Sequence, residues 1–102
     1  MPDPTPPPLD ARPARRREVA FRARGDEIVI PLDEPAGAEH ELTPVGGRIW
    51  QLCDGRHTLL QIAEQLTAEL QVDPREARMD VTALVAQLCE MRLLQLDAEQ
   101  GA

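Results

Sequence analysis

The chain has 102 residues, of which 42% are hydrophobic and only two are aromatic, and its formal net charge is −7. An acidic chain without lysine disfavours the counterion exchange with phosphates on which nucleic-acid binding depends, and no apolar run reaches the ~18 residues of a membrane span. Because the N-terminus also lacks the apolar core of a signal peptide, we expect one small cytoplasmic domain that binds neither nucleic acid nor membrane.

The beginning of the chain is rich in proline and arginine. Six of the ten prolines fall within residues 1–13, and the cluster Arg15–Arg17 follows. Proline fixes φ and cannot donate a backbone hydrogen bond, so we expect residues 1–16 to form a disordered tail and the arginines to be a solvated flank. The folded domain is then expected over residues 17–96, followed by a frayed end at 97–102.

From Glu18 onward, short runs in which apolar and polar residues alternate predict β-strands. The first two are joined by a turn at Gly25, the residue type that a tight hairpin favours. The apolar residues of each strand share one side: Val19, Phe21 and Ala23 in the first, and Ile28, Ile30 and Leu32 in the second. A third, very short strand is expected over residues 39–42, after prolines that end the second one.

Three helices are expected after the strands, and each begins at a capping residue: Thr43, Thr58 and Asp73. Proline follows two of these caps, where its missing N–H costs nothing, and Gln61 completes a capping box with Thr58. Asp54-Gly55 ends the first helix, and the third runs to about Arg92. The sequence therefore predicts an α+β fold, a three-stranded antiparallel sheet followed by three helices (β-β-β-α-α-α), akin to a winged helix with its strands placed first.

Catalytic and metal-binding patterns are scarce. His40 and His57 fall in separate elements, and Cys53 and Cys89 lie far apart without C-x-x-C spacing. A nucleophile–base pair or a zinc site needs several such groups converging on one point. We therefore expect no enzyme activity, no cofactor and no metal site in this chain.

Two features favour binding instead. The strand at residues 39–42 would leave unpaired backbone groups if it lies at a sheet edge. Beside its core stripe of Val81, Leu84, Val85 and Leu88, the third helix carries a second stripe of mostly small residues: Met79, Thr82, Ala86, Cys89 and Leu93. Together they would form a groove for an extended peptide. An ordinary protected edge and close helix packing explain the same residues, so periodicity alone leaves both interpretations open.

Several short segments match the pattern of a known family. Leu42–Trp50, which contains the only tryptophan, is similar to L-N-x-x-(G/A)-x-x-I-W, and Asp54–Thr58 is similar to D-G-x-x-(T/S). Ile62–Leu66 resembles I-(A/V)-x-x-L, and Arg92–Leu94 resembles G-L-(L/I). In this order and spacing, residues 17–96 resemble the PqqD-like family, also called RiPP recognition elements.

The chain departs from the family pattern at two helix ends. Thr43 stands where the family has asparagine, and both residue types can cap a helix. Arg92 stands where the family has glycine, which puts the geometry of that turn in question because arginine disfavours positive φ.

The resemblance implies a function. In this family the leader segment of a ribosomally made precursor peptide adds as an antiparallel strand to the third strand, lies against the third helix, and is presented to a modifying enzyme, often a radical S-adenosylmethionine (SAM) enzyme. The implied partners are therefore such a peptide, from PQQ biosynthesis or another peptide pathway, and such an enzyme, with this chain as monomer or homodimer. The candidate peptide-binding residues are Glu39, His40, Glu41 and Leu42 on the strand and, as geometric choices on the helix, Met79, Thr82, Ala83, Ala86 and Gln87.

Two alternatives stay open at the level of the sequence. A structural adaptor would dock the same apolar stripe permanently on a partner protein and would need no peptide. A winged-helix DNA-binding regulator would use Arg15–Arg17 as a minor-groove arm, which the acidic third helix disfavours.

Overall fold

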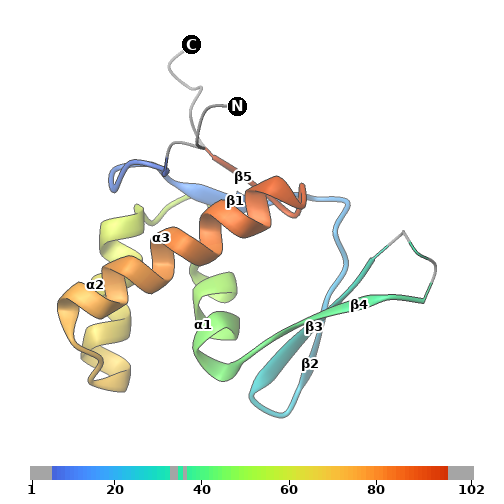
Figure 1. The fold of residues 1–102 in the computed structure, drawn as a ribbon, viewed down its shortest axis with the longest axis horizontal. Coiled ribbons are helices and arrows are strands. Elements are labelled where there is room, and N and C mark those ends of the chain that lie inside the picture. Colours follow the sequence, from blue (N-terminus) through green and yellow to red (C-terminus); the bar gives the residue numbers. More distant parts are fainter. Residues whose placement is uncertain (1–5, 33–34, 36, 97–102) are drawn as a thin grey trace.

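The computed structural model describes residues 6–32, 35 and 37–96. In chain order the elements are β1 (Pro13–Arg15), β2 (Arg22–Arg24), β3 (Glu27–Pro31), β4 (Glu39–Leu42), α1 (Pro44–Leu52), α2 (Leu59–Leu70), α3 (Pro74–Glu90) and β5 (Leu94–Leu96). Figure 1 shows the helices on one side and the sheet of β2, β3 and β4 projecting on the other. None of the helices in this part of the chain is long and apolar enough to cross a membrane.

The expected α+β fold is confirmed. β2, β3 and β4 form an antiparallel sheet in that order, and the three helices follow it in the chain. The third strand of this sheet spans the predicted residues 39–42. The first is shorter than predicted and begins at Arg22, because Phe21 leaves the ladder and places its ring edge-on against Trp50, with 5.4 Å between the ring centres.

The helices begin at the predicted caps. The side chain of Thr43 accepts a hydrogen bond from the backbone N–H of Gly46, and Asp73 accepts two from the first turn of α3. Thr58 and Gln61 form the predicted capping box at the start of α2. These side chains satisfy amides that have no partner inside their own helix.

The inner face of the sheet and the three helices enclose one core. Ile28 and Ile30 of β3 pack in it together with Trp50 of α1 and with buried residues of α2 and α3. The start of α1 lies very close to β3, since a Cβ on Gly47 would be only 3.0 Å from Cγ1 of Ile28. Glycine at this position therefore allows the close approach that seats α1, and β4 leads directly into that helix.

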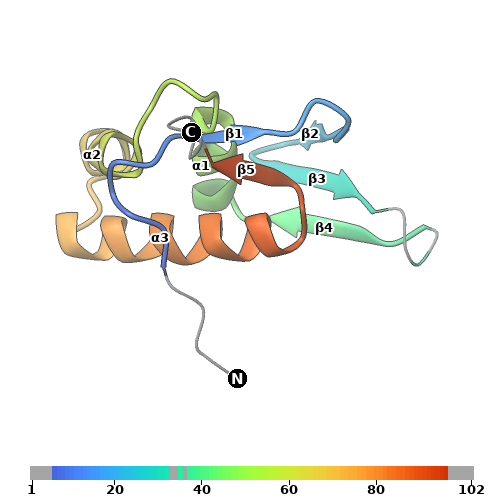
Figure 2. The same ribbon diagram turned by 90° about the horizontal axis from the view of Figure 1, so that it is seen from above.

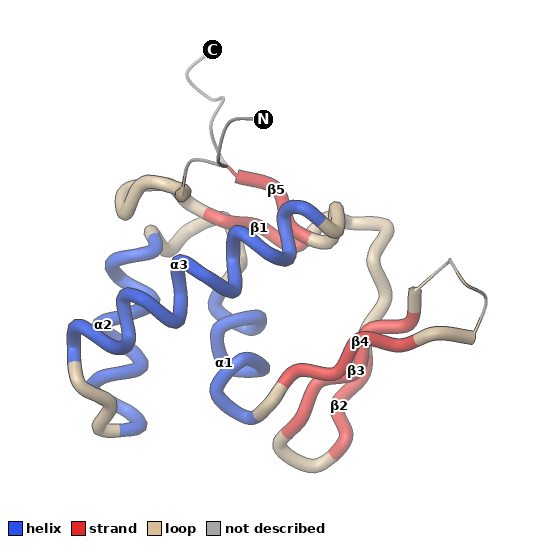
Figure 3. The backbone as a smooth tube through the Cα atoms, in the orientation of Figure 1, coloured by secondary structure: helices blue, strands red, loops and turns tan. Residues whose placement is uncertain are grey.

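The N-terminal segment differs from the disordered tail predicted for residues 1–16. β1 pairs with β5 in a second, two-stranded sheet (Figure 3), and Ala11 is buried. The Ala11 carbonyl accepts a hydrogen bond of 3.0 Å from the N–H of Leu59, in the first turn of α2, where amides lack partners within the helix. Proline removes donors but keeps acceptors, so a proline-rich segment suits this position. Residues 1–5 of the predicted tail and the predicted frayed end at 97–102 lie outside the described residues.

The turn after α3 keeps the geometry that glycine usually provides. Arg92 has a φ of +62°; its N–H donates to the carbonyl of Cys89, and the N–H of Leu93 donates to that of Leu88. These two bonds form the Schellman motif, whose left-handed residue is usually glycine. The departure at Arg92 therefore preserves the turn into β5 but places an arginine in a strained backbone conformation.

Candidate functional site

β4 lies at an edge of the three-stranded sheet. It pairs with β3 on one side, and no other strand pairs with it in the described part of the chain. Figure 2 shows that β4 is the strand of this sheet on the side of α3. The fold therefore places the edge strand and the third helix, the two elements singled out in the sequence, on the same side of the molecule.

The hydrogen-bond register identifies the backbone groups at this edge. The N–H of Leu32 donates to the carbonyl of Ala38 at 2.8 Å, so these two residues form a hydrogen-bonded pair. Bonded and non-bonded pairs alternate along an antiparallel ladder. His40 and Leu42, which continue the bonded series, therefore direct their N–H and C=O groups toward β3.

Glu39 and Glu41 occupy the intervening positions, and their N–H and C=O groups point to the open edge. Side chains also alternate between the two faces of the sheet with a period of two residues. Leu42 is buried and His40 half-buried on the core face, whereas Glu39 and Glu41 are exposed on the outer face. An added strand would thus meet two donors and two acceptors, with glutamate side chains on one face and core-facing side chains on the other.

Two ion pairs cross the outer face of the sheet. Arg22 lies 2.8 Å from Glu39, and Arg24 lies 2.9 Å from Glu41, both pairs reaching from β2 over the central strand to β4. Val29 of β3 lies on this same face, between Arg22 and Glu41 in the register, and is fully buried. The pKa of Arg24 is raised, first by its hydrogen bond to Glu41. The ion pairs therefore cover a valine on the face opposite the core.

One flank of α3 faces the start of α1 and the end of β4. A Cβ built on Gly46 would lie 3.5 Å from the Leu84 side chain and 3.5 Å from Cβ of Leu42, so these two leucines flank the same point. Residues three, four and seven positions apart share a helix face. The flank of Leu84 therefore also carries Gln87 and Met91, and we call these three residues the β4 flank of α3.

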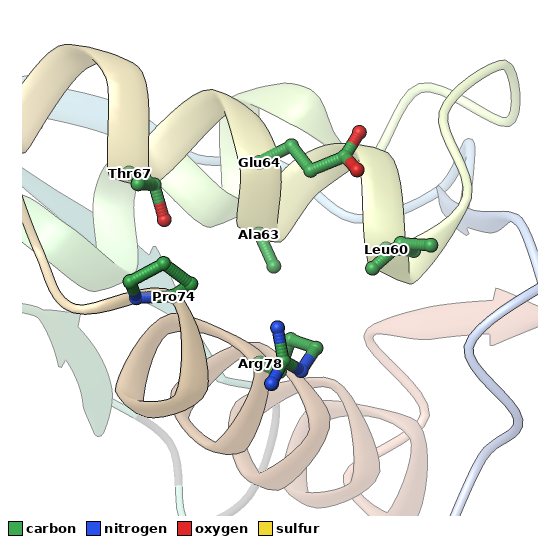
Figure 4. A pocket seen from close by; sticks show the side chains of 6 residues that line it. All are labelled: Leu60, Ala63, Glu64, Thr67, Pro74 and Arg78. Carbon is green, nitrogen blue, oxygen red and sulfur yellow. The ribbon is translucent and has the colours of Figure 1, made fainter.

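The opposite flank of α3 faces α2. Arg78 lines a crevice of about 200 Å³ together with Leu60, Ala63 and Thr67 of α2, and Figure 4 shows these side chains around it. Thr82 follows Arg78 by four residues, so it lies on this same flank.

The predicted helix residues are divided between these two sides. Gln87 belongs to the β4 flank, and Ala83 lies exposed one turn before it. Thr82 and Ala86 lie on the α2 side, and Met79 is 62% exposed on the far side of the helix from the core. Sequence reasoning placed Leu84 only in the core and did not consider Met91 for the groove. A usable signal was that Leu84 stands at the margin of the core stripe.

A hollow of about 590 Å³ lies where the β4 flank ends. It is lined by Met91 and Arg92 after α3, by Pro31 and Leu32 at the end of β3, and by Val19 in the loop between β1 and β2. Leu32 is opposite Ala38, just before β4. The hollow therefore extends the β4 flank at the end of the sheet where β4 begins.

The cysteine thiols are poor nucleophiles in this environment. Burial raises the pKa of Cys53 to about 12 and also raises the pKa of Cys89. The thiolate is the reactive form of cysteine, so both side chains stay protonated near neutral pH. No group of three or more histidine, cysteine or acidic side chains suited to a metal ion occurs among the described residues.

The arginine cluster is partly structural. Arg15 donates to the backbone carbonyls of Trp50 and Gln51 at 2.8 and 2.9 Å, in the last turn of α1. Arg16 is paired with Glu18 at 2.9 Å. These two guanidinium groups are therefore engaged within the chain, which disfavours both the solvated flank expected for Arg15 and the minor-groove arm of the DNA-binding alternative.

Protein-family and sequence comparisons point to one family. The family model "Coenzyme PQQ synthesis protein D (PqqD)" matches residues 29–94. A "PqqA binding protein" of Xanthomonas oryzae pv. oryzae (strain PXO99A) is 33% identical over 90 residues, which cover 85% of this chain and 94% of that protein. Its counterpart in Xanthomonas axonopodis pv. citri (strain 306) has the same identity and coverage.

Two solved structures are similar in fold as well as in sequence. TbiB1 in complex with the TbiA(beta) leader peptide superposes with a TM-score of 0.69 at 26% identity, covering 80% of this chain and 94% of that chain. The PqqD truncation of Methylobacterium extorquens PqqCD, described as a functional stand-alone RiPP recognition element, superposes with a TM-score of 0.66 at 27% identity, covering 81% and 87%.

Proposed function

The chain belongs to the PqqD family, and on that basis we propose that it binds the leader segment of a ribosomally synthesised precursor peptide and presents it to a modifying enzyme. The leader adds as an antiparallel strand to β4 and lies against the β4 flank of α3. The observation that carries this proposal is the open edge of β4, where the backbone groups of Glu39 and Glu41 point away from β3.

Main-chain hydrogen bonds supply the affinity in this mode of binding, and side-chain pockets supply the specificity. Alternate side chains of the leader face the core side, where Leu84, Gln87, Met91 and half-buried His40 surround them. A larger apolar side chain enters the hollow beside Met91 and Leu32. Glu39, His40, Glu41, Leu42, Ala83 and Gln87 thus remain peptide-binding candidates, whereas Met79, Thr82 and Ala86 are replaced by Leu84 and Met91.

The role that we propose for the chain is presentation, without a chemical step of its own. Its two thiols are held protonated by burial. A modifying enzyme, of the radical SAM type in our proposal, supplies the chemistry and any metal centre. PqqA and other precursor peptides are both candidate ligands, since backbone pairing accepts many sequences.

The test is a titration of the ¹⁵N-labelled protein with synthetic leader segments of PqqA and of short peptides encoded near its gene, followed by backbone amide NMR. We expect shifts at residues 39–43 and along the β4 flank of α3, with Met79 unaffected. Shifts on the α2 side would contradict the proposed groove. If no peptide causes shifts, but the protein co-elutes with a partner protein in gel filtration without peptide, the adaptor interpretation replaces this one.

A proline substitution provides a sharp control. Glu41→Pro removes one outward N–H and leaves the bonds between β3 and β4 intact, since His40 and Leu42 make them. Glu41→Ala removes the carboxylate and keeps the N–H. We expect the proline variant to bind a leader about tenfold more weakly than the alanine variant, because one main-chain bond is lost in a partly buried strand. Equal affinities would contradict strand addition at this edge.

A further inference from the structure

The outer face of the sheet carries an ordered alternation of charge. β2 presents Arg22 and Arg24, the central strand presents buried Val29 and, beside Arg24, Glu27, and β4 presents Glu39 and Glu41, each of which is paired with one arginine. A row of positive side chains is therefore followed by a row of negative ones at the open edge.

Glu39 and Glu41 are also the two residues whose backbone groups point to that edge. In an antiparallel strand added there, the residues opposite them would form hydrogen-bonded pairs, and their side chains would lie on the same outer face. The next row of side chains would thus stand directly beside the two carboxylates.

Both ion pairs are made through Oε2 of the glutamate. A carboxylate has two oxygens and accepts several hydrogen bonds at once. The second oxygen of each group can therefore accept from a cation on an added strand, while Arg22 and Arg24 hold the carboxylates over Val29.

We propose that Glu39 and Glu41 select leader peptides with basic side chains at two positions separated by one residue, and that this pair sets the register of the peptide. The proposal rests on the proposed strand addition to β4 and names its specificity. An acidic residue opposite either glutamate is disfavoured by like-charge repulsion across the strands.

The register of the added peptide is favoured because a shift by one residue would be unfavourable. Shifting a strand by one residue moves every side chain to the other face. The basic side chains would then face Leu84, Met91 and Leu42, where a charge loses hydration against apolar side chains. The outer carboxylates therefore favour one alignment, and the apolar flank of α3 disfavours the next.

The experiment is a selection from a displayed library of random peptides on the whole chain, repeated on a charge-swapped variant. The swap is Arg22→Glu, Arg24→Glu, Glu39→Arg and Glu41→Arg, with Glu27→Gln in both proteins because Glu27 lies 3.4 Å from Arg24. It inverts the charge of the edge row while keeping opposite-sign pairs and the net charge. Circular dichroism and the amide spectrum establish that both proteins are folded.

We expect peptides selected on the unswapped protein to carry lysine or arginine at alternate positions, and those selected on the swapped protein to carry aspartate or glutamate there. For a basic and an acidic peptide of the same apolar pattern, each protein should bind its preferred peptide about tenfold more tightly than the other, since two cross-strand pairs differ. This difference in affinity should diminish in 1 M salt.

The outcomes separate the two proposals. Selected peptides that shift the amides of β4 without a charge pattern, or with a pattern that the swap does not invert, overturn the selection by Glu39 and Glu41 and leave strand addition standing. Selected peptides that shift only amides elsewhere, or a library that yields no binder, overturn both.

Discussion

The edge strands β1 and β4, which belong to the two different sheets of this molecule, differ in how their outer edges are occupied. β1 pairs with β5 on one side, and on the other the N–H of Arg15 donates to Cys53 and the N–H of Gly55 donates to Pro13. β4 pairs with β3 on one side only. The edge of β1 is thus filled by the turn that follows α1, whereas the edge of β4 is open. The difference teaches that a strand edge in this fold can be closed by the chain itself, as at β1, and that β4, which is left open on the side of α3, is the candidate for binding.

The largest effect should come from removing the closed edge. Deleting residues 2–16 removes β1, the burial of Ala11 and the Arg15 bonds to α1, and we expect a loss of about 3 kcal/mol in the free energy of unfolding. Urea denaturation measures it. An unchanged midpoint would mean that this segment is the disordered tail that its composition suggests.

Proline substitutions compare the two edges directly. Arg15→Pro removes the N–H that donates to the Cys53 carbonyl. The matched control is Arg15→Ala, which lacks the guanidinium but keeps this N–H. We expect the proline variant to be less stable than the alanine variant by about 2 kcal/mol in the free energy of unfolding. We expect Glu41→Pro to be less stable than Glu41→Ala by only about 0.5 kcal/mol in the free energy of unfolding, since the N–H of residue 41 has no partner in the described chain. Thermal unfolding of the four variants decides the matter, and equal costs at the two sites would show that the β4 edge is not open.

A smaller effect is expected at the turn that leads into β5. Arg92 adopts a φ of +62°, and Arg92→Gly should stabilise the fold by about 0.5–1 kcal/mol, the relief of left-handed strain less the added freedom of the unfolded chain. Gln71→Gly, at the other non-glycine residue with positive φ among those that the structure describes, should change stability in the same direction. Destabilisation by Arg92→Gly alone would indicate that the arginine side chain itself supports the closed sheet.

The smallest effect concerns an ion pair between α1 and α2, away from both edges. Arg48 donates to both carboxylate oxygens of Glu69 at 2.7 Å, and this pairing lowers the pKa of Glu69 to about 2. Because the folded-state pKa lies below the ordinary value of 4.5, the stabilisation is present above about pH 4.5 and is lost as the pH falls toward 2. The contribution is small, since both side chains are about one-third exposed. Glu69→Gln should flatten the dependence of the melting temperature on pH in that window, and an identical slope would contradict the assignment.

Much of the fold follows from local signals. Thr43, Thr58 and Asp73 mark the three helix starts because a capping side chain acts on amides within three residues of itself. Residues 39–42 form a strand as expected, since alternation is also a local property. The family followed from the order and spacing of short motifs, and the family model matches the chain from residue 29 to residue 94.

The parts in which the structure departs from the sequence-based expectations depend on distant partners. Composition marked residues 1–16 as disordered, yet β1 forms because β5, some eighty positions later, and the amide of Leu59 use its backbone groups. The groove residues on α3 were chosen from helical spacing and small size, and three of the five, Met79, Thr82 and Ala86, lie away from the β4 flank. Small residues look alike on either flank of a helix, so only the contacts of Leu84 and Arg78 distinguish the two.

The sequence by itself therefore determined the elements, their caps, the fold class and the family, because each depends on neighbours in the chain or on motif order. Only the tertiary structure decided which edge stays open, which flank of α3 faces it, and that Glu39 and Glu41 carry both the outward backbone groups and the outer charges. These properties arise when strands and helices distant in sequence pack against one another, and the register of their pairing is a property of the whole fold.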